Sequence, residues 1–308
     1  AAEAHLYPEG SSRELTGAVA SSLGVDPLTV FVGSGSNEVI ELLIRTFTAA
    51  DDEAVVCRGS FLMYKVALQA HGRRFREVPM APGFRYDLPA MAAALDPSTR
   101  MVFLANPDNP TGTAFGRGAL EAFLPRVPED CLVVLDEAYF EFVDWPEYPN
   151  GLHYLARWPN LVVLRTFSKI HGLAGLRLGY GVMRPELVAY LHRTRMPFNV
   201  SSLAQAAGLA ALADVDHVRS TRALNLAEVP RVRQGLLALG LDVPESHGNF
   251  VFADLGRPAA PVAEALLRRG NIVRPVPGYG FPQALRISVG LPEWNDRLLS
   301  AMREVLRE

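Results

Sequence analysis

Short apolar runs alternate with amphipathic segments over the first two thirds of the sequence. Six runs rich in Val, Leu and Ile show no apolar/polar alternation, which is typical of strands buried on both faces of a sheet. They occupy residues 28–32, 53–57, 100–105, 131–136, 161–166 and 177–183. Segment 37–47 between them has helical spacing, and Ser11 and Ser12 precede a capped helical stretch that ends at Gly24. The pattern predicts an α/β unit, with helices on both faces of a mostly parallel sheet.

The pattern changes after about residue 200. An Ala- and Leu-rich helical stretch covers residues 201–239 and is predicted to break near Asp214. Beyond it we expect strands at 249–255, 271–275 and 284–290, and helices at 261–269 and from Pro292. The smaller number of strands predicts an α+β unit with an antiparallel sheet, packed on the first unit. We therefore predict a large domain over residues 1–202 and a small domain over residues 203–308.

The composition limits the class of protein. The 308 residues are 49% hydrophobic and 20% charged, with a formal net charge of −3. These values are typical of a folded globular protein and do not indicate nucleic-acid or membrane-surface binding. No apolar run approaches the roughly 18 residues of a membrane span, and the first twenty residues do not resemble a secretory leader. We expect a cytosolic protein, with Cys57 and Cys131 buried in apolar runs instead of forming a disulfide framework or a zinc site.

Lysine is scarce in this sequence. Of the 30 basic residues, only Lys65 and Lys169 are lysines. Arg serves wherever a positive charge is enough, whereas Lys can lose its proton and act as a nucleophile. Lys65 lies in a helical stretch, and we interpret it as a surface residue. Lys169 comes directly after a predicted strand and is the candidate nucleophile.

Polar residues gather where four predicted strands end, and ligands of open parallel sheets bind at the carboxyl ends of strands. The first end, residues 33–38, places Ser36 and Asn37 at the start of a helix. Free N–H groups and the helix dipole suit an anion there, and a plain capped turn is the structural alternative. The Gly-x-Gly spacing also resembles a dinucleotide fingerprint, but Glu38 stands at the position of its third glycine.

Two further strand ends carry an amide and a carboxylate. In residues 106–112, Asn-Pro turns give a rigid path that can project Asn109 from the sheet, and a purely structural turn is the alternative. Asp136 ends a run of buried aliphatic residues, where a carboxylate needs a cationic or N–H partner. Its alternative role is a helix cap. Tyr139 follows three residues later, so the two polar groups converge if the chain turns helical there.

The fourth strand end combines hydroxyls with basic groups. Thr166, Ser168 and Lys169 end the strand, and a glycine-bearing loop leads to Arg177. Hydroxyls and a guanidinium fork suit a phosphate dianion, and Lys169 is a candidate imine-forming amine. Together the four ends supply what pyridoxal 5′-phosphate requires: a lysine for its aldehyde, a carboxylate for its ring nitrogen, donors for its phenolic oxygen and an anion cradle.

Six sequence strings carry a resemblance to a known family. They are LYPEG, GSGSNEVIELLIRTF, NPDNPTG, LDEAYFEF, RTFSKIHGLAGLRLGYG and LRISVG. In this order, over most of the chain, they resemble the histidinol-phosphate aminotransferase branch of the fold-type I pyridoxal-phosphate enzymes. The resemblance implies a cytoplasmic, homodimeric transaminase of histidine biosynthesis. It would move an amino group between histidinol phosphate, or a similar amino substrate, and 2-oxoglutarate.

The resemblance also implies roles for individual residues. Lys169 would hold the cofactor covalently and move protons, and Asp136 would contact its ring nitrogen. Tyr139 and Asn109 would donate to its phenolic oxygen, and Phe61 would stack on its ring. The phosphate would be bound by Ser36, Asn37, Thr166, Ser168 and Arg177.

Further implied roles concern the substrate and the partner subunit. Arg286 would bind a substrate carboxylate, and Arg274 would bind the far anionic end of the substrate. Tyr7, in the N-terminal segment 1–24, would reach the partner subunit's site. The sequence departs from the family pattern at Asn37, where many members have Asp, and at Asp108, where many have Asn. It begins in the region of LYPEG, without the arm that members use to close over the substrate.

Three alternatives stay open. Threonine-phosphate decarboxylase, a lyase, shares the cofactor motifs and also takes a phosphorylated substrate. An aminotransferase for aromatic or other α-amino acids would share them too. A ligand-sensing module of a regulator is the alternative from a different class, and the sequence has no helix-turn-helix segment or basic arm to support it.

Overall fold

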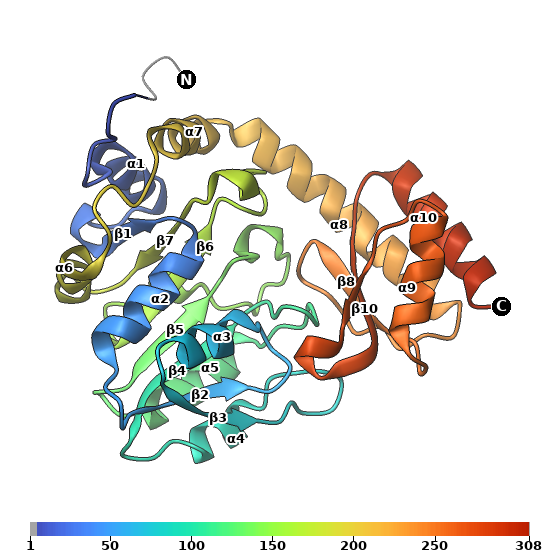
Figure 1. The fold of residues 1–308 in the computed structure, drawn as a ribbon, viewed down its shortest axis with the longest axis horizontal. Helices are drawn as coiled ribbons and strands as arrows, with labels where there is room; N and C mark the ends of the chain where they lie inside the picture. Colours follow the sequence, from blue (N-terminus) through green and yellow to red (C-terminus); the bar gives the residue numbers. More distant parts are fainter. Residues whose placement is uncertain (1–4, 308) are drawn as a thin grey trace.

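The computed structural model describes residues 5–307, which form a larger and a smaller part (Figure 1). The larger part holds a seven-stranded sheet in the order β1-β7-β6-β5-β4-β2-β3, and the smaller part holds a three-stranded sheet in the order β8-β10-β9. The strands are β1 (Val30–Gly33), β2 (Glu53–Cys57), β3 (Arg74–Val78), β4 (Thr99–Ala105), β5 (Leu132–Asp136), β6 (Leu161–Thr166), β7 (Gly179–Val182), β8 (Phe250–Asp254), β9 (Arg274–Val276) and β10 (Phe281–Ser288). The helices are α1 (Arg13–Leu23), α2 (Ser36–Phe47), α3 (Met63–Ala70), α4 (Leu88–Ala93), α5 (Arg117–Phe123), α6 (Pro185–Thr194), α7 (Ser202–Ala213), α8 (Val215–Leu237), α9 (Ala259–Arg268) and α10 (Pro292–Val305).

The strand directions confirm the predicted architecture. The five neighbouring strands β6, β5, β4, β2 and β3 run parallel, whereas β7 pairs antiparallel with both β6 and β1. The small sheet is antiparallel throughout. The long helical stretch breaks at Asp214, whose side chain accepts from the His217 N–H at 3.0 Å and caps α8.

Alternate residues of the central strands pack on opposite faces of the large sheet. Leu132 and Val134 of β5 belong to an apolar cluster with α2, α3 and α6. Val133 and Leu135 belong to a second cluster with α4 and α5. Because this alternation continues to the end of each strand, it decides which polar side chains face which side.

Three local predictions were wrong or incomplete. Strand β3 was not predicted, because it lies at the sheet edge and, apart from the buried Val78, its residues alternate between exposed and partly buried. Residues 28 and 29 belong to a short 3-10 helix, so β1 begins only at Val30. The Ser12 side chain does not cap α1; the Glu9 carboxylate accepts the N–H groups of Ser11 (2.9 Å) and Arg13 (2.8 Å) instead.

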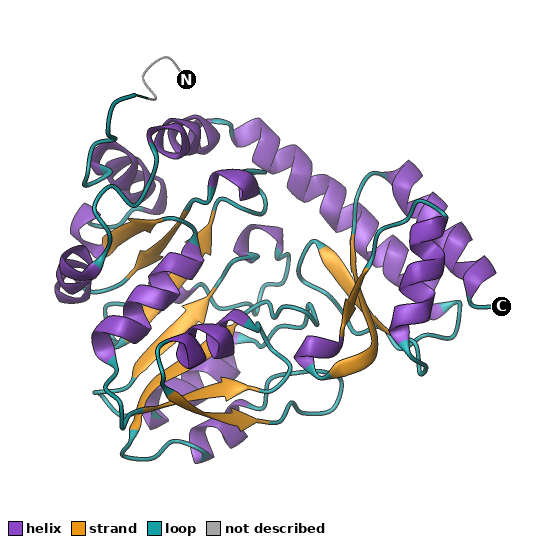
Figure 2. Cartoon of the chain, in the orientation of Figure 1, coloured by secondary structure: helices purple, strands orange, loops and turns teal. Residues whose placement is uncertain are grey.

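Two helices join the parts (Figures 1 and 2). Helix α7 packs on α1, and its Ala204 lies in one apolar cluster with residues of α1, β1 and β7. Helix α8 runs on to the smaller part, where Val229, Val232 and Leu236 pack with β8, α9 and α10. The boundary at residue 202 stays a prediction, and the packing of α7 favours a boundary nearer Asp214.

Within residues 5–307, no helix is long and apolar enough to span a membrane.

Candidate active site

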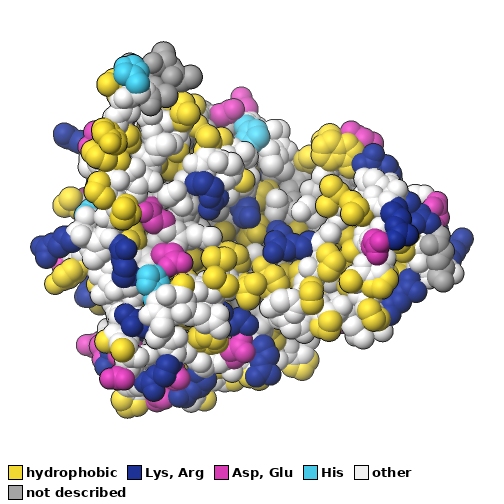
Figure 3. Space-filling model, in the orientation of Figure 1, with side chains coloured by type: hydrophobic (Ala, Val, Ile, Leu, Met, Phe, Trp, Pro, Cys, Tyr) yellow, Lys and Arg dark blue, Asp and Glu magenta, His cyan; other side chains and the backbone are white. Residues whose placement is uncertain are grey.

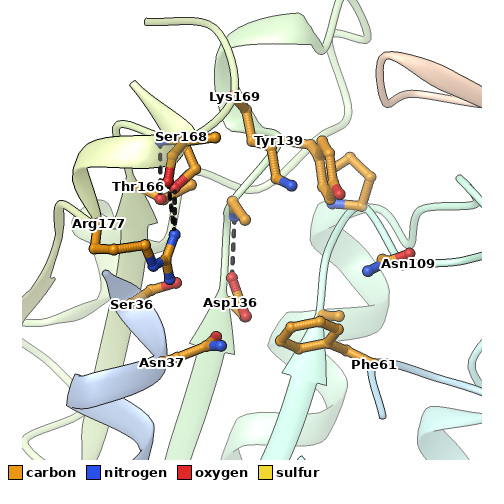
Figure 4. Close-up of a pocket in the computed structure, with 14 residues that line it drawn as sticks. Ser36, Asn37, Phe61, Asn109, Asp136, Tyr139, Thr166, Ser168, Lys169 and Arg177 are labelled. Atoms are coloured by element: carbon orange, nitrogen blue, oxygen red, sulfur yellow. Dashed lines mark hydrogen bonds between the residues drawn. The ribbon is translucent and has the colours of Figure 1, made fainter. Parts of the chain in front are cut away.

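A cavity of about 230 Å³ lies at the carboxyl ends of β4, β5 and β6, beside the start of α2 (Figure 4). On the face shown in Figure 3, Lys and Arg side chains stand around a hollow between the two parts. The cavity brings together all but three of the site residues predicted from the sequence. Those that line it are Ser36, Asn37, Phe61, Asn109, Asp136, Tyr139, Thr166, Ser168, Lys169 and Arg177.

Asp136 presents a buried carboxylate to this cavity. It is 4% exposed, and its oxygens accept from the Tyr64 hydroxyl at 3.0 Å and from the Ala138 N–H at 3.1 Å. Burial raises the pKa of Asp136 to about 6, and the two donors and the positive charge of Lys169 oppose the rise. Tyr64 was missed in the sequence, because an aromatic residue within a helical stretch gives no sign of a polar role.

Lys169 follows β6 and points into the cavity (Figure 4). Its Nζ lies 5.2 Å from the centre of the Tyr139 ring. Burial lowers the pKa of Lys169, and the charge of Arg286 lowers it further. A lowered pKa increases the share of neutral amine, which is the nucleophilic form. Lys65, by contrast, forms an ion pair with Glu77 at 2.6 Å, and neither residue lines the cavity.

Two glycines allow the start of α2 to approach its neighbours closely. Gly35 has φ 79°, and a Cβ at that position would lie 2.6 Å from Nη2 of Arg177. A Cβ at Gly179 in β7 would clash with the backbone N of Ser36. The N–H groups at the start of α2 and the Arg177 guanidinium therefore share one corner of the cavity, which suits an anion.

Hydroxyls complete this corner. Nη1 of Arg177 donates to Oγ of Ser168 at 3.5 Å, and the Ser168 N–H donates to Oγ1 of Thr166 at 3.1 Å (Figure 4). The turn before α2 is closed by Glu38, whose carboxylate accepts the Ser34 N–H at 2.5 Å. A side chain therefore fills the position where a dinucleotide motif requires glycine.

The opposite side of the cavity is formed by Tyr139, Asn109 and Phe61. The Tyr139 hydroxyl accepts from Nη2 of Arg286 at 3.3 Å, and burial raises the pKa of Tyr139 to about 12. Oδ1 of Asn109 is buried and, within residues 5–307, has no hydrogen-bond partner. The Phe61 ring packs edge-on against Tyr64, with ring centres 5.3 Å apart. This side therefore presents an amide group, a protonated phenol and an aromatic face to the cavity.

Three predicted residues do not line the cavity. Arg286 and Arg274 are cross-strand partners in β10 and β9, and the Arg286 guanidinium lies 4.0 Å from the centre of the Phe250 ring. Both arginines are close enough to lower the pKa of Lys169, so they lie near the cavity. Tyr7 is 82% exposed and stacks on Phe198 at 4.7 Å. It does not reach the cavity of its own chain.

Comparison with known proteins adds sequence relatives and solved structures. Residues 1–302 match the family described as aminotransferase class I and II. The histidinol-phosphate aminotransferase of Anaeromyxobacter sp. (strain Fw109-5) is 55% identical over 306 residues, which are 99% of this chain and 84% of the relative. Histidinol-phosphate aminotransferase 2 of Pseudomonas aeruginosa is 50% identical over 305 residues, which are 99% of this chain and 82% of the relative.

Two solved structures show how far the fold is shared. Histidinol-phosphate aminotransferase from Sinorhizobium meliloti, solved in complex with pyridoxal-5′-phosphate, has a TM-score of 0.91 and 31% identity, covering 100% of this chain and 84% of that one. L-threonine-O-3-phosphate decarboxylase from Porphyromonas gingivalis has a TM-score of 0.85 and 21% identity, covering 99% and 91%, so it shares the fold alone. The predicted fold-type I architecture is confirmed. With a family match across residues 1–302, the chain belongs to the class I and II aminotransferases.

Proposed function

We propose that this protein is a histidinol-phosphate transaminase of histidine biosynthesis that uses pyridoxal 5′-phosphate and 2-oxoglutarate. One observation carries the proposal: a buried carboxylate, a lysine of lowered pKa and an anion-binding corner meet in a single cavity. The substrate assignment is supported by 55% identity to a protein of that name.

The residues of the cavity fit pyridoxal 5′-phosphate. In Figure 4 the amide nitrogen of Asn109 faces the cavity, so its NH2 group can donate to the phenolic oxygen of the cofactor. Because Gly35 has no side chain, the Arg177 guanidinium can lie directly against the start of α2, where it faces the same ligand as the helix N–H groups. Hydroxyls, helix N–H groups and a guanidinium are the donors that a phosphate dianion requires, and the group would be held there by Ser36, Ser168 and Arg177.

When bound, the cofactor supplies an aldehyde that condenses with amines and a ring that accepts electrons from the substrate carbon. Lys169 would hold the aldehyde through Nζ, and its lowered pKa favours the neutral amine that can take up and return a proton. Asp136, whose ionised form is favoured by Tyr64 and Ala138, would hold a proton on the ring nitrogen. Tyr139 keeps its hydroxyl proton at neutral pH because its pKa is raised, so it can act as a donor. Arg286 would orient the carboxylate of the oxo acid.

The homodimer is part of the proposal. Tyr7, near the start of the chain, is exposed and packs on Phe198. It does not line the cavity of the same chain. This placement supports a role for Tyr7 in a partner subunit's site. The cytosolic location also stays a prediction from the sequence.

The two lysines provide a matched test of the covalent attachment. Lys169→Arg keeps the positive charge but cannot form an imine, whereas Lys65→Arg changes a residue outside the cavity. After borohydride treatment with the cofactor, we expect wild type and Lys65→Arg to gain the cofactor's mass and Lys169→Arg to gain none. We also expect Lys169→Arg to lose activity by about a thousand-fold or more. A full adduct on Lys169→Arg would contradict the assignment.

Turnover assays test the reaction. Histidinol phosphate with 2-oxoglutarate should give glutamate, and threonine phosphate should give no carbon dioxide. Carbon dioxide release from threonine phosphate, without glutamate from the first mixture, would overturn the proposal in favour of the lyase alternative.

A further inference from the structure

A second buried carboxylate, Asp108, lies next to Asn109 and has no part in the function proposed above. It is 0% exposed, and its oxygens accept from the Ser60 hydroxyl at 2.5 Å and from the Thr111 hydroxyl at 2.8 Å. Burial raises the pKa of Asp108 to about 6, and the Ser60 and Thr111 hydrogen bonds oppose the rise. A buried carboxylate with neutral donors is costly, so its position needs an explanation.

The hydrogen bonds on the Ser60 side have a definite direction. An ionised carboxylate only accepts, so Ser60 donates its one hydroxyl proton to Asp108. The Tyr86 hydroxyl, 2.6 Å from Oγ of Ser60, therefore donates to Ser60 and accepts the Ala105 N–H at 3.0 Å. This chain of hydrogen bonds fixes Ser60, and Ser60 directly precedes Phe61. The carboxylate thus holds the segment that carries the aromatic face of the cavity.

On its other side, Asp108 closes the turn that carries Asn109. Its N–H donates to the Thr113 carbonyl at 2.8 Å, and its carbonyl accepts the Gly112 N–H at 2.9 Å. The Thr111 hydroxyl bonds the carboxylate from within the same turn. Asn109 lies inside this loop, and Figure 4 shows Asn109 and Phe61 on the same side of the cavity.

We propose that Asp108 is a positioning residue, whose carboxylate ties the Phe61 segment to the Asn109 turn and so fixes both side chains against the cofactor. The proposal rests on the proposed function for the identity of that ligand, but the coupling of the two segments is independent of it.

The same turn also contacts the smaller part of the molecule. The His247 N–H donates to the Gly112 carbonyl at 2.8 Å, and a Cβ at Gly112 would clash with the Ser246 side chain. The turn that Asp108 holds therefore carries a cavity residue and touches the part that bears Arg286.

Asp108→Ala and Asp87→Ala form a matched pair of variants. Asp87 caps α4 by accepting the Ala90 N–H at 2.9 Å, and it does not line the cavity. Both substitutions remove a hydrogen-bonded carboxylate, so both lower stability. We expect only Asp108→Ala to weaken binding of pyridoxal 5′-phosphate, by about ten-fold or more, in a titration followed by absorbance. Its kcat should fall while KM for histidinol phosphate changes less than about two-fold.

Hydrogen exchange of the cofactor-free protein measures the coupling itself. In Asp108→Ala, residues 59–64 and 106–113 should lose protection together, whereas Asp87→Ala should leave both segments protected. Ser60→Ala should loosen only the first segment and Thr111→Val only the second, since each variant removes one hydrogen bond to the carboxylate. If Asp108→Ala does not fold, hydrogen exchange of Ser60→Ala and Thr111→Val tests the proposal instead.

The outcomes separate the two proposals. Equal cofactor affinities for Asp108→Ala and Asp87→Ala, or exchange that stays unchanged in either segment, would overturn the role of Asp108. In the test with Ser60→Ala and Thr111→Val, a loss of protection in both segments on Ser60→Ala would also overturn the role of Asp108. A wild-type protein that does not bind the cofactor would refute the proposed function, and the exchange experiment would still decide whether Asp108 couples the segments.

Discussion

Asp136 and Glu137 are consecutive acids at the end of β5, yet they lie on opposite faces of the sheet. Asp136 continues the face that packs on α2 and α3, and it lines the cavity. Glu137 continues the face that packs on α4 and α5. The neighbouring strand repeats the division, because Thr166 lines the cavity and Arg165 lies beside Glu137. Strand alternation therefore separates the chemistry of the cavity from the stabilising charges behind it.

The two acids differ in their partners. Glu137 is 0% exposed and accepts from Nη2 (2.8 Å) and Nε (3.1 Å) of Arg165 and from the Gly151 N–H at 2.7 Å. Both hydrogen-bond donors of Asp136 are neutral. Glu137 is neutralised by Arg165 inside the protein. Asp136 lines the cavity and has only neutral donors, so it is a candidate for binding a positively charged ligand group.

The largest effect should come from Asp136→Asn. The amide keeps the shape but cannot stabilise a proton on a ring nitrogen, so we expect kcat to fall by about a hundred- to ten-thousand-fold. Single-turnover kinetics with bound cofactor measure the change, and Glu137→Gln is the control from the opposite face. If the kcat of Asp136→Asn stayed within ten-fold of wild type, the proposed difference in role between Asp136 and Glu137 would be wrong.

Glu137→Gln should act on stability instead. It removes the carboxylate that is paired with the buried Arg165 at 2.8 Å, and breaking a buried ion pair costs about 3–5 kcal/mol. Urea unfolding of the cofactor-free protein measures the loss, with Asp136→Asn as the comparison. If both variants lost the same stability, the proposed division of roles would fail.

The next effect is a pH dependence of stability without cofactor. Burial raises the pKa of Asp136 from 3.8 to about 6, so the folded state binds this proton more tightly than the unfolded state. The resulting stabilisation is fully present below pH 3.8 and is lost as the pH rises through about 6. Asp136→Asn removes this titration, so its stability relative to wild type should increase between these pH values, by up to about 3 kcal/mol. A difference independent of pH would contradict the buried, ionising acid.

The smallest effect should come from Tyr64→Phe, which removes one hydrogen bond to the Asp136 carboxylate. A hydrogen bond to a charged group contributes about 1.5–3 kcal/mol, so kcat should fall by about ten-fold or more. Because this hydroxyl favours the ionised form, its loss should also move the acidic limb of the pH–rate profile upward. Tyr154→Phe, which removes a hydroxyl bonded to Glu121, is the control and should leave the profile in place.

Most residues of the cavity could be predicted from the sequence, because they lie at the ends of strands that the apolar runs predict. Asp136, Lys169 and Asn109 each follow a run of buried aliphatic residues, and parallel strands bring such ends together. Tyr64 could not be found this way, since its hydroxyl meets Asp136 only through the packing of α3 on the sheet. The coupling role proposed for Asp108 was missed for the same reason, because its partner Ser60 lies 48 positions earlier.

Some predictions failed because local sequence is an incomplete guide to backbone conformation. Ser12 has the residue type of a helix cap, but it adopts φ 50° and the more distant Glu9 supplies the acceptor. Tyr7 poses a different problem, because its predicted role needs a second chain. A single chain shows only that its ring is exposed and packs on Phe198.

The scarcity of lysine also determines where amine-directed reagents can label the protein. Amine-directed dyes and cross-linkers have two side-chain targets in this sequence, Lys65 and Lys169. The Lys65 side chain is 19% exposed and is paired with Glu77, whereas Lys169 lines the cavity. Loading with pyridoxal 5′-phosphate before coupling would shield Lys169, so conjugation at side chains would be directed to a single site on α3. A fluorophore or a surface linker could then be attached away from the reacting groups without any engineered cysteine.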